Sequence, residues 1–194
     1  MTYQPKILAF AGSLRKDSFN KKLIAIAIKG ALDAGASVTH IDLKNYPLPV
    51  YDQDIEDASG IPENALKIKE LMYTHDGFLL SLPEYNSSMS CAFKNVIDWV
   101  SRPSAKNEVY LGCFTDKAVA LLSTSVGPLG GMRGLVHARA MFGAINSIVL
   151  PKQKSIPLAD SAFLPDGSLK DPKQQQDAQE IGKALATFLT RYKG

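Results

Sequence analysis

The sequence has only two cysteines, Cys91 and Cys113, and neither belongs to a CxxC pair. Two cysteines cannot build the disulfide framework of a small secreted protein, so a reducing compartment is expected. The N-terminus runs almost directly into an apolar segment, without the charged region, apolar region and cleavage site of a secretory signal. No apolar run approaches the roughly 20 residues that a helix needs to cross a bilayer. We therefore expect a cytoplasmic protein.

Other functional classes lack their sequence signatures. The three histidines, His40, His75 and His137, are far apart and lack metal-ligand spacing. The formal net charge is only +3 and the basic residues are scattered among acids, so a nucleic-acid partner is not expected. The chain has neither a GxGxxG nor a Walker A loop, and it offers no catalytic triad or paired catalytic carboxylates. Any redox or transfer chemistry would have to come from a cofactor.

What the sequence does contain is a regular alternation of strands and helices. Short apolar segments predict strands at residues 6–11, 37–41, 77–82, 117–122 and 148–150. Helical patterns follow at about 19–34, 62–73, 91–101, 133–144 and from 171 onward, while 42–60 is predicted to be a surface connection. Such alternation predicts right-handed βαβ units around a parallel sheet. We expect one α/β domain, residues 1–194, a flavodoxin-like three-layer sandwich with strand order 2-1-3-4-5.

Three polar loops follow strands one, three and four of this sheet. We call residues 12–20 the first loop, 83–90 the second loop and 123–131 the third loop. In open parallel sheets, ligands bind outside the carboxyl ends of the strands, where the strand order reverses. The crevice would lie between strands one and three, so the three loops are expected to meet at one site.

The first loop has the groups that bind a phosphate. Ser13, Ser18, Asn20 and Arg15 provide two hydroxyls, a carboxamide and a guanidinium, beside the free amides of a helix start. Such groups suit a terminal phosphate dianion. A second interpretation stays open at this point, in which Ser18 only caps the helix and Arg15 is a surface charge.

The other two loops suit a planar ring. The second loop carries Tyr85 and several backbone amides, and Glu84 could act as a general base or simply be hydrogen-bonded. The glycines of the third loop permit close approach of a ligand to the backbone. A ring held by loop amides, with its phosphate on the first loop, describes a mononucleotide.

At these loops the sequence resembles the NAD(P)H-dependent FMN reductase family, which includes bacterial quinone, chromate and azo-dye reductases. The motifs are GSLRKDSFN at 12–20, PEYN at 83–86 continuing into FKNVIDW at 93–99, and SxG at 125–127 followed by GGxR at 130–133. The resemblance covers nearly the whole chain. This sequence departs from the family at Ser90-Cys91, where the family usually has Pro-Gly. The difference bears on acceptor preference and on assembly.

The resemblance implies the residues that contact FMN and the reaction. The implied FMN contacts are Ser13, Arg15, Ser18, Phe19, Asn20, Pro83, Glu84, Tyr85, Asn86, Ser87, Ser125 and Gly127. Lys94, Asn95, Asp98 and Trp99 would brace the second loop. The implied reaction carries a hydride from NADPH or NADH through FMN to a small acceptor (quinone, azo dye, chromate or free flavin). It would be a ping-pong cycle in a homodimer or homotetramer, with no side chain acting as acid or base.

Two other functions stay open on the sequence. One is a flavodoxin-type electron carrier that binds FMN but accepts no hydride. The other is a flavin-free interaction module built on the same fold.

Overall fold

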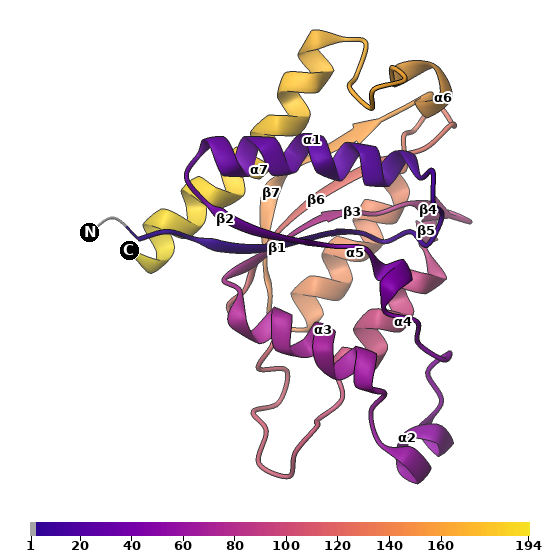
Figure 1. Ribbon diagram of the computed structural model, residues 1–194, viewed down its shortest axis with the longest axis vertical. Coiled ribbons are helices and arrows are strands. Elements are labelled where there is room, and N and C mark those ends of the chain that lie inside the picture. The colour runs from indigo at the N-terminus through magenta and orange to yellow at the C-terminus, as the bar shows by residue number, and fades with distance from the viewer. Residues whose placement is uncertain (1–2) are drawn as a thin grey trace.

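The computed structural model describes residues 3–194 (Figure 1). Five strands form one sheet in the order β2-β1-β3-β6-β7, and every neighbouring pair is parallel. The strands are β1 Lys6–Ala11, β2 Ser37–Ile41, β3 Gly77–Ser81, β6 Ala118–Thr124 and β7 Ile148–Ile156. This order, counted over the five strands of the sheet, confirms the predicted 2-1-3-4-5 arrangement and the flavodoxin-like fold.

Helices cover both faces of the sheet and make the outer two of three layers (Figure 1). One face carries α1 (Phe19–Asp33) and α7 (Pro172–Lys193), and the other carries α3 (Glu63–Thr74), α4 (Cys91–Val100) and α5 (Met132–Ala144). Each face buries its own apolar cluster. β3 and β6 are buried along their whole lengths, which explains their continuous apolar sequence.

Two glycines allow α1 and α7 to pack closely. A Cβ on Gly30 would lie 1.9 Å from the carbonyl oxygen of Gln179, and a Cβ on Gly182 would lie 1.9 Å from that of Ala27. Any larger residue at these positions would push the helices apart. The contact fixes α1 against the sheet and so fixes the position of its N-terminus.

The structure extends the last predicted strand. The sequence predicts a strand that stops at Leu150, before Pro151, but β7 continues to Ile156. A proline is tolerated because β7 is an edge strand and because the β6–β7 register shifts between Val119 and Leu121. The added length brings the chain beside the third loop.

Several short elements were not predicted. The predicted surface connection 42–60 contains a 3₁₀ turn (Leu43–Asn45) and α2 (Gln53–Ser59), which buries no residue and so has no apolar pattern to detect. The second loop contains a hairpin of β4 (Glu84–Tyr85) and β5 (Ser88–Met89), and α6 (Ala159–Ala162) follows β7. Within residues 3–194, no helix combines the length and apolarity needed to cross a membrane.

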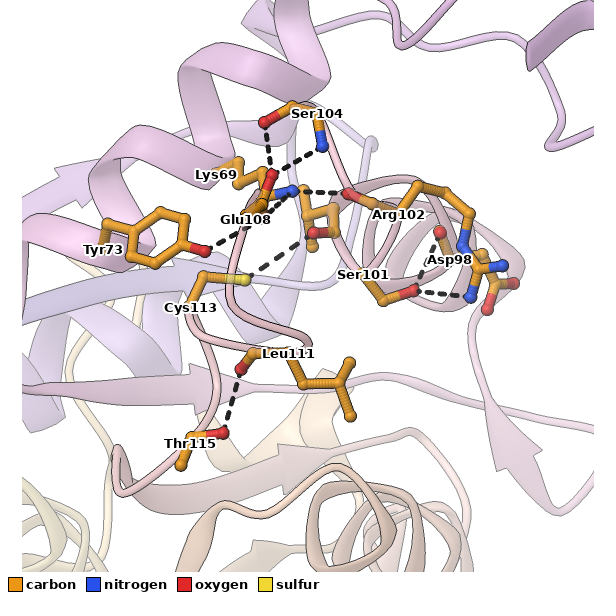
Figure 2. A network of polar contacts seen from close by, with 11 residues as sticks. Lys69, Tyr73, Asp98, Ser101, Arg102, Ser104, Glu108, Leu111, Cys113 and Thr115 are labelled. Atoms are coloured by element: carbon orange, nitrogen blue, oxygen red, sulfur yellow. Dashed lines mark hydrogen bonds and ion pairs between the residues drawn. The ribbon is translucent and has the colours of Figure 1, made fainter. Parts of the chain in front are cut away.

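A buried ion pair holds the long segment between α4 and β6 (Figure 2). Lys69 on α3 pairs with Glu108 and donates to the carbonyl oxygen of Arg102. Glu108 also accepts from Tyr73 Oη at 2.9 Å and from the amide and hydroxyl of Ser104. The charge of Glu108 is thus surrounded by donors, and the segment is anchored to α3.

Candidate functional site

The three loops meet at one side of the sheet, where β1, β3 and β6 end; we call this side the rim. Two buried hydroxyls connect neighbouring strand ends directly. Ser90 Oγ in the second loop donates to the carbonyl oxygen of Gly12 at 2.5 Å. Ser123 Oγ at the end of β6 donates to the carbonyl oxygen of Leu82 at 2.6 Å. The predicted convergence of the loops is therefore seen in the structure.

The side chain of Asn20 is committed to the protein itself. Its Nδ2 donates to the carbonyl oxygen of Thr124 at 2.9 Å, and its Oδ1 accepts from Ser81 Oγ at 2.8 Å and from the Thr124 amide at 3.1 Å. The sequence placed this carboxamide among the phosphate-binding groups. In the structure both of its polar atoms bond within the protein and position the first loop, which leaves the second Nδ2 hydrogen and the backbone amide for a ligand.

Phe19 is likewise turned into the protein. Its ring stacks on Phe163 with centroids 5.5 Å apart, and the ammonium of Lys22 lies 5.4 Å from its centroid. The backbone amide of Phe19, the first residue of α1, has no partner within the helix.

The remaining first-loop residues surround the N-terminus of α1. Ser13 and Ser18 are buried, whereas Arg15 is exposed. Ser13 Oγ accepts from the amide of Arg15 at 3.4 Å, which curves the loop. Ser18 is the N-cap residue of α1, yet its side chain makes no capping hydrogen bond. The interpretation of Ser18 as a mere helix cap is therefore not what the structure shows.

The second loop is a tight hairpin. Asn86 and Ser87 connect its strands, and both have positive φ, at 51° and 64°. A two-residue connection of this kind matches the twist of antiparallel strands. Pro83 is buried at the base of the hairpin, whereas Tyr85 is 49% exposed near its tip. The hairpin thus presents Tyr85 and the turn to solvent beside the first loop.

Glu84 fastens this hairpin to α5. Its Oε1 accepts from Nε of Arg133 at 3.0 Å and lies 2.8 Å from Nη2, and its Oε2 accepts from the amide of Gly134 at 3.1 Å. Burial raises the pKa of Glu84, but the donors of Gly134 and Arg133 outweigh burial and hold the pKa below its usual value. A carboxylate held ionised by these partners is a poor general base near neutral pH.

The third loop is tied to the chain that follows β7. The carbonyl oxygen of Gly127 accepts from the amides of Gly130 and Leu158, and the amide of Ala159 donates to the carbonyl of Ser125 at 3.0 Å. Gly131 precedes α5 with φ of 84°, and a Cβ there would lie 1.9 Å from Ser123 Oγ. The half-buried Ser125 and Gly127 lie at the start of this loop, next to the end of β6.

Three long helices begin at the rim, and their N-termini differ. Ser90 Oγ accepts from the amide of Phe93 and so caps α4. The carboxylate of Glu84 accepts from the amide of Gly134 in the first turn of α5. In the part of the chain that the structure describes, no side chain caps α1.

The FKNVIDW segment braces a different part of the chain from the one predicted. The indole nitrogen of Trp99 and Nδ2 of Asn95 both donate to the carbonyl oxygen of Pro49 at 2.8 Å, and Asn95 Oδ1 accepts from the amide of Tyr51. These residues hold segment 49–51, not the second loop. Lys94 and Asp98 form an exposed pair on one helix face at 2.6 Å.

Four buried hydroxyl residues at the rim were not predicted: Ser81, Ser90, Ser123 and Thr124. Each bonds to a loop or to a neighbouring strand end. For Ser81, Ser123 and Thr124 the signal in the sequence was a hydroxyl at the end of an otherwise apolar strand, in FLLS and ALLST, whereas Ser90 precedes the helix α4. A cavity of about 620 Å³, lined by Tyr46, Leu66 and Tyr73 among others, lies along α3 and is not part of this site.

The comparisons with known proteins agree with this geometry. The profile of NADPH-dependent FMN reductases matches residues 5–160. An NAD(P)H-dependent FMN reductase of Pseudomonas aeruginosa is 33% identical over 190 residues, 97% of each chain. A 2-hydroxy-1,4-benzoquinone reductase of a Burkholderia species is 35% identical over 187 residues, 96% of this chain and 93% of the relative.

A solved structure shows the same likeness in three dimensions. FerB, a flavoenzyme NAD(P)H:(acceptor) oxidoreductase from Paracoccus denitrificans, superimposes with a TM-score of 0.78 and 28% identity, over 96% of this chain and 98% of FerB. The predicted cofactor, FMN, and the predicted donor, NADPH or NADH, agree with the names of the matching family and of the Pseudomonas relative. With three polar loops meeting at one rim of a flavodoxin-like sheet, the chain belongs to the NADPH-dependent FMN reductase family.

Proposed function

We propose that this chain is an NAD(P)H-dependent oxidoreductase with FMN as its cofactor, which reduces a small acceptor. A quinone is the first candidate acceptor, with azo dyes, chromate and free flavin as further ones. The family and the quinone reductases among the relatives support this activity. Donor and acceptor would use the same open rim in turn, which is a ping-pong order.

The observation that carries the proposal is the free N-terminus of α1. Ser90 and Glu84 occupy the amides at the starts of α4 and α5, whereas the first-turn amides of α1 meet no side-chain cap within residues 3–194. Free amides and the helix dipole favour an anion by about 0.3–1 kcal/mol, and by up to about 2 when partly buried. A phosphate would be stabilised there without displacing any protein group.

The first loop fits a phosphate dianion by its donor set. Ser18 Oγ is not used for capping, Ser13 Oγ is close by in the same loop, and Arg15 is free to turn its guanidinium inward. Charge-assisted hydrogen bonds from these groups are stronger than neutral ones. Together with the amides of Phe19 and Asn20 they would hold the phosphate of FMN.

The other two loops would hold the ring. Tyr85, Asn86 and Ser87 would border it from the hairpin, with Pro83 and Glu84 keeping the hairpin rigid, and Ser125 and Gly127 would approach it through the backbone. Bound FMN would supply the hydride-accepting ring that no side chain of this chain contains. The residues themselves provide orientation and proximity, and backbone donors stabilise negative charge near the ring. No acid or base is required, in agreement with the hydrogen bonds that occupy Glu84.

The proposal includes self-association as a dimer or tetramer. Val126, Leu129, Met132, Val136 and Leu158 are exposed apolar side chains on the third loop, α5 and the segment after β7. Such side chains gathered beside a site are typical of subunit contacts. Light scattering behind a sizing column would give the mass. The cysteines, Cys91 exposed and Cys113 buried, are unpaired, which supports the proposed cytoplasmic location.

The test is a visible absorption spectrum of the purified protein, followed by NADPH and NADH oxidation against a panel of acceptors. We expect flavin bands, or their appearance after addition of FMN, and steady oxidation of NADPH with a quinone. FMN uptake without any steady NADPH oxidation would instead identify an electron carrier. A protein that takes up no FMN would contradict the proposal altogether.

A further inference from the structure

A second hollow lies directly beside the first loop. This groove, of about 470 Å³, begins at residues 16–18 and runs along the outer side of α1 past Lys22, Ile26 and Lys29. Its other wall is the turn 166–168 together with Gln175 at the start of α7. The groove therefore shares Ser18 with the proposed phosphate site.

The groove is positively charged. Four lysines, Lys16, Lys21, Lys22 and Lys29, line it, against two aspartates. Lys21 is paired with Asp42 at 2.7 Å, but the other three lysines form no ion pair within the described chain. Unpaired ammonium groups along one groove attract anionic ligands.

The two aspartates of the groove only partly offset these lysines. Asp166 accepts from the amide and the hydroxyl of Ser168, at 2.9 and 2.6 Å, and these hydrogen bonds together with the charge of Lys22 lower its pKa. Asp17 is exposed and forms no ion pair among residues 3–194. The excess of positive charge therefore stays available to a ligand.

The groove is not polar throughout. Ala25 and the buried Ile26 line it beside the lysines, and Oε1 of Gln175 accepts from the amide of Leu169, which fixes the carboxamide in place. An apolar surface bordered by an amide suits a flat heterocyclic base, and the lysines suit phosphate. These are the two chemical parts of an adenosine phosphate.

The geometry points to this groove as the binding site for the adenosine-phosphate half of a dinucleotide whose other half reaches the rim. The inference rests on the proposed function, because it takes the first loop as the phosphate site next to which the groove opens. Two ligands carry this half: the NAD(P)H donor and flavin adenine dinucleotide. Both would place phosphate near Lys16 and Lys22 and the base over Ile26.

The experiment is calorimetric titration of ADP into the FMN-loaded full-length protein at low salt. Lys29→Glu should weaken ADP binding about tenfold, because it reverses a charge at the far end of the groove. Lys22→Gln should weaken it in the same direction, because it removes an ammonium beside the phosphate. Lys106→Glu is the matched control, since Lys106 is an exposed lysine outside the groove, and it should leave ADP binding unchanged. Absence of ADP binding, or equal binding by Lys29→Glu and the wild type, would overturn the inference.

Two further measurements identify the source of the ligand. A raised KM for NADPH in Lys29→Glu, with kcat retained, would assign the groove to the donor. Weaker binding of FAD but not of FMN to the flavin-free variant would assign it to a flavin dinucleotide. If neither quantity changes, no dinucleotide uses the groove and the inference fails.

The failure of this inference is distinguishable from failure of the proposed function. FMN uptake and NADPH oxidation by the wild type are measured on the same preparation and do not depend on ADP. Intact turnover with no ADP binding would contradict only the assignment of the groove as an adenosine-phosphate site. Loss of FMN uptake or turnover in the wild type would contradict the proposed function. The ADP titration would then still show whether Lys29 contributes to an anion site.

Discussion

The carboxamide of Asn20 and the backbone of Thr124 form a reciprocal pair of hydrogen bonds, with Nδ2 donating at 2.9 Å and Oδ1 accepting at 3.1 Å. The same Oδ1 accepts from Ser81 Oγ. One side chain therefore joins the start of α1 to the ends of β3 and β6, although these three elements lie far apart in the sequence.

We predict that Asn20→Ala lowers the free energy of unfolding by about 2–3 kcal/mol, because it leaves buried donors and acceptors of Ser81 and Thr124 without partners. Urea unfolding of the flavin-free protein measures this value. Asn107→Ala, at an exposed position, is the control and should change stability by no more than about 0.5 kcal/mol. Equal stability of the two variants would show that the reciprocal pair does not hold the rim together.

Ser18→Ala should weaken FMN binding about tenfold, because it removes a hydroxyl donor to a charged phosphate. Riboflavin, which has the same ring and no phosphate, should bind the variant and the wild type alike. Fluorescence quenching of the two flavins measures both affinities. Ser37→Ala on the exposed start of β2 serves as the control. An equal loss for riboflavin would place Ser18 at the ring and contradict the phosphate assignment.

Glu84→Gln should keep kcat within about tenfold of the wild type when FMN is saturating, whereas loss of a general base costs about 10²–10⁴-fold. The variant should release FMN faster, since a neutral amide holds Arg133 and Gly134 less firmly. Steady-state kinetics and flavin dissociation rates separate these effects. Arg133→Gln should reproduce the faster release. A drop in kcat beyond a hundredfold for Glu84→Gln alone would make Glu84 a catalytic group.

Glu108 should make part of the stability depend on pH. Burial raises its pKa, but Lys69, Ser104 and Tyr73 bring the pKa down to about 2 from the ordinary 4.5 (Figure 2). A carboxyl whose pKa is lowered by folding stabilises the folded state fully above pH 4.5, and the contribution, about 3 kcal/mol, disappears as pH falls toward 2. Glu108→Gln should therefore be less stable than the wild type at pH 7.

The stability difference between Glu108→Gln and the wild type should narrow between pH 4.5 and 2. Urea unfolding at a series of pH values measures it. Glu70→Gln, at an exposed position on the same helix as Lys69, is the control and should stay within about 0.5 kcal/mol of the wild type throughout. A difference for Glu108→Gln that does not depend on pH would contradict the ionic role of this carboxylate.

The two thiols should react very differently. Burial raises the pKa of Cys113 to about 11, whereas Cys91 is exposed at the start of α4. A disulfide reagent at pH 8 should therefore label one thiol in the folded protein and two after denaturation. Cys91→Ser should abolish the fast reaction. Rapid labelling of both thiols in the folded wild type would mean that the segment holding Cys113 opens readily.

Patterns of hydrophobicity predicted the sheet and its order because buried parallel strands and amphipathic helices leave signatures in consecutive residues. These patterns failed where an element's place in the folded structure, rather than its own residues, determines its conformation. Pro151 ends a strand in the sequence but is tolerated on the edge strand β7, and α2 leaves no pattern because it buries nothing. The sequence predicts that Trp99 and Asn95 brace the second loop, but both donate to the carbonyl oxygen of Pro49. Every residue has a backbone carbonyl, so the sequence does not mark Pro49 as their partner.

For the site, the sequence predicted which loops meet but not which polar atoms remain free. Asn20 and Ser18 look alike as phosphate ligands in the sequence. In the structure the carboxamide of Asn20 is bonded to Thr124, whereas the hydroxyl of Ser18 makes no capping hydrogen bond. That distinction depends on the direction of a side chain, which follows from packing across β3 and β6. The buried Ser81 and Ser123 were overlooked because a single serine at a strand end is ordinary in composition.

The hydrogen bonds of Glu84 also bear on the direction in which a ligand with one charged end would lie. Glu84 occupies the amide of Gly134 and pairs with Arg133 at the start of α5, whereas the first-turn amides of α1 have no side-chain cap within residues 3–194. A molecule with one doubly charged end and one neutral planar end would therefore be held more firmly with its charged end at α1. The unequal supply of free amides at the two helix starts would set the direction of binding.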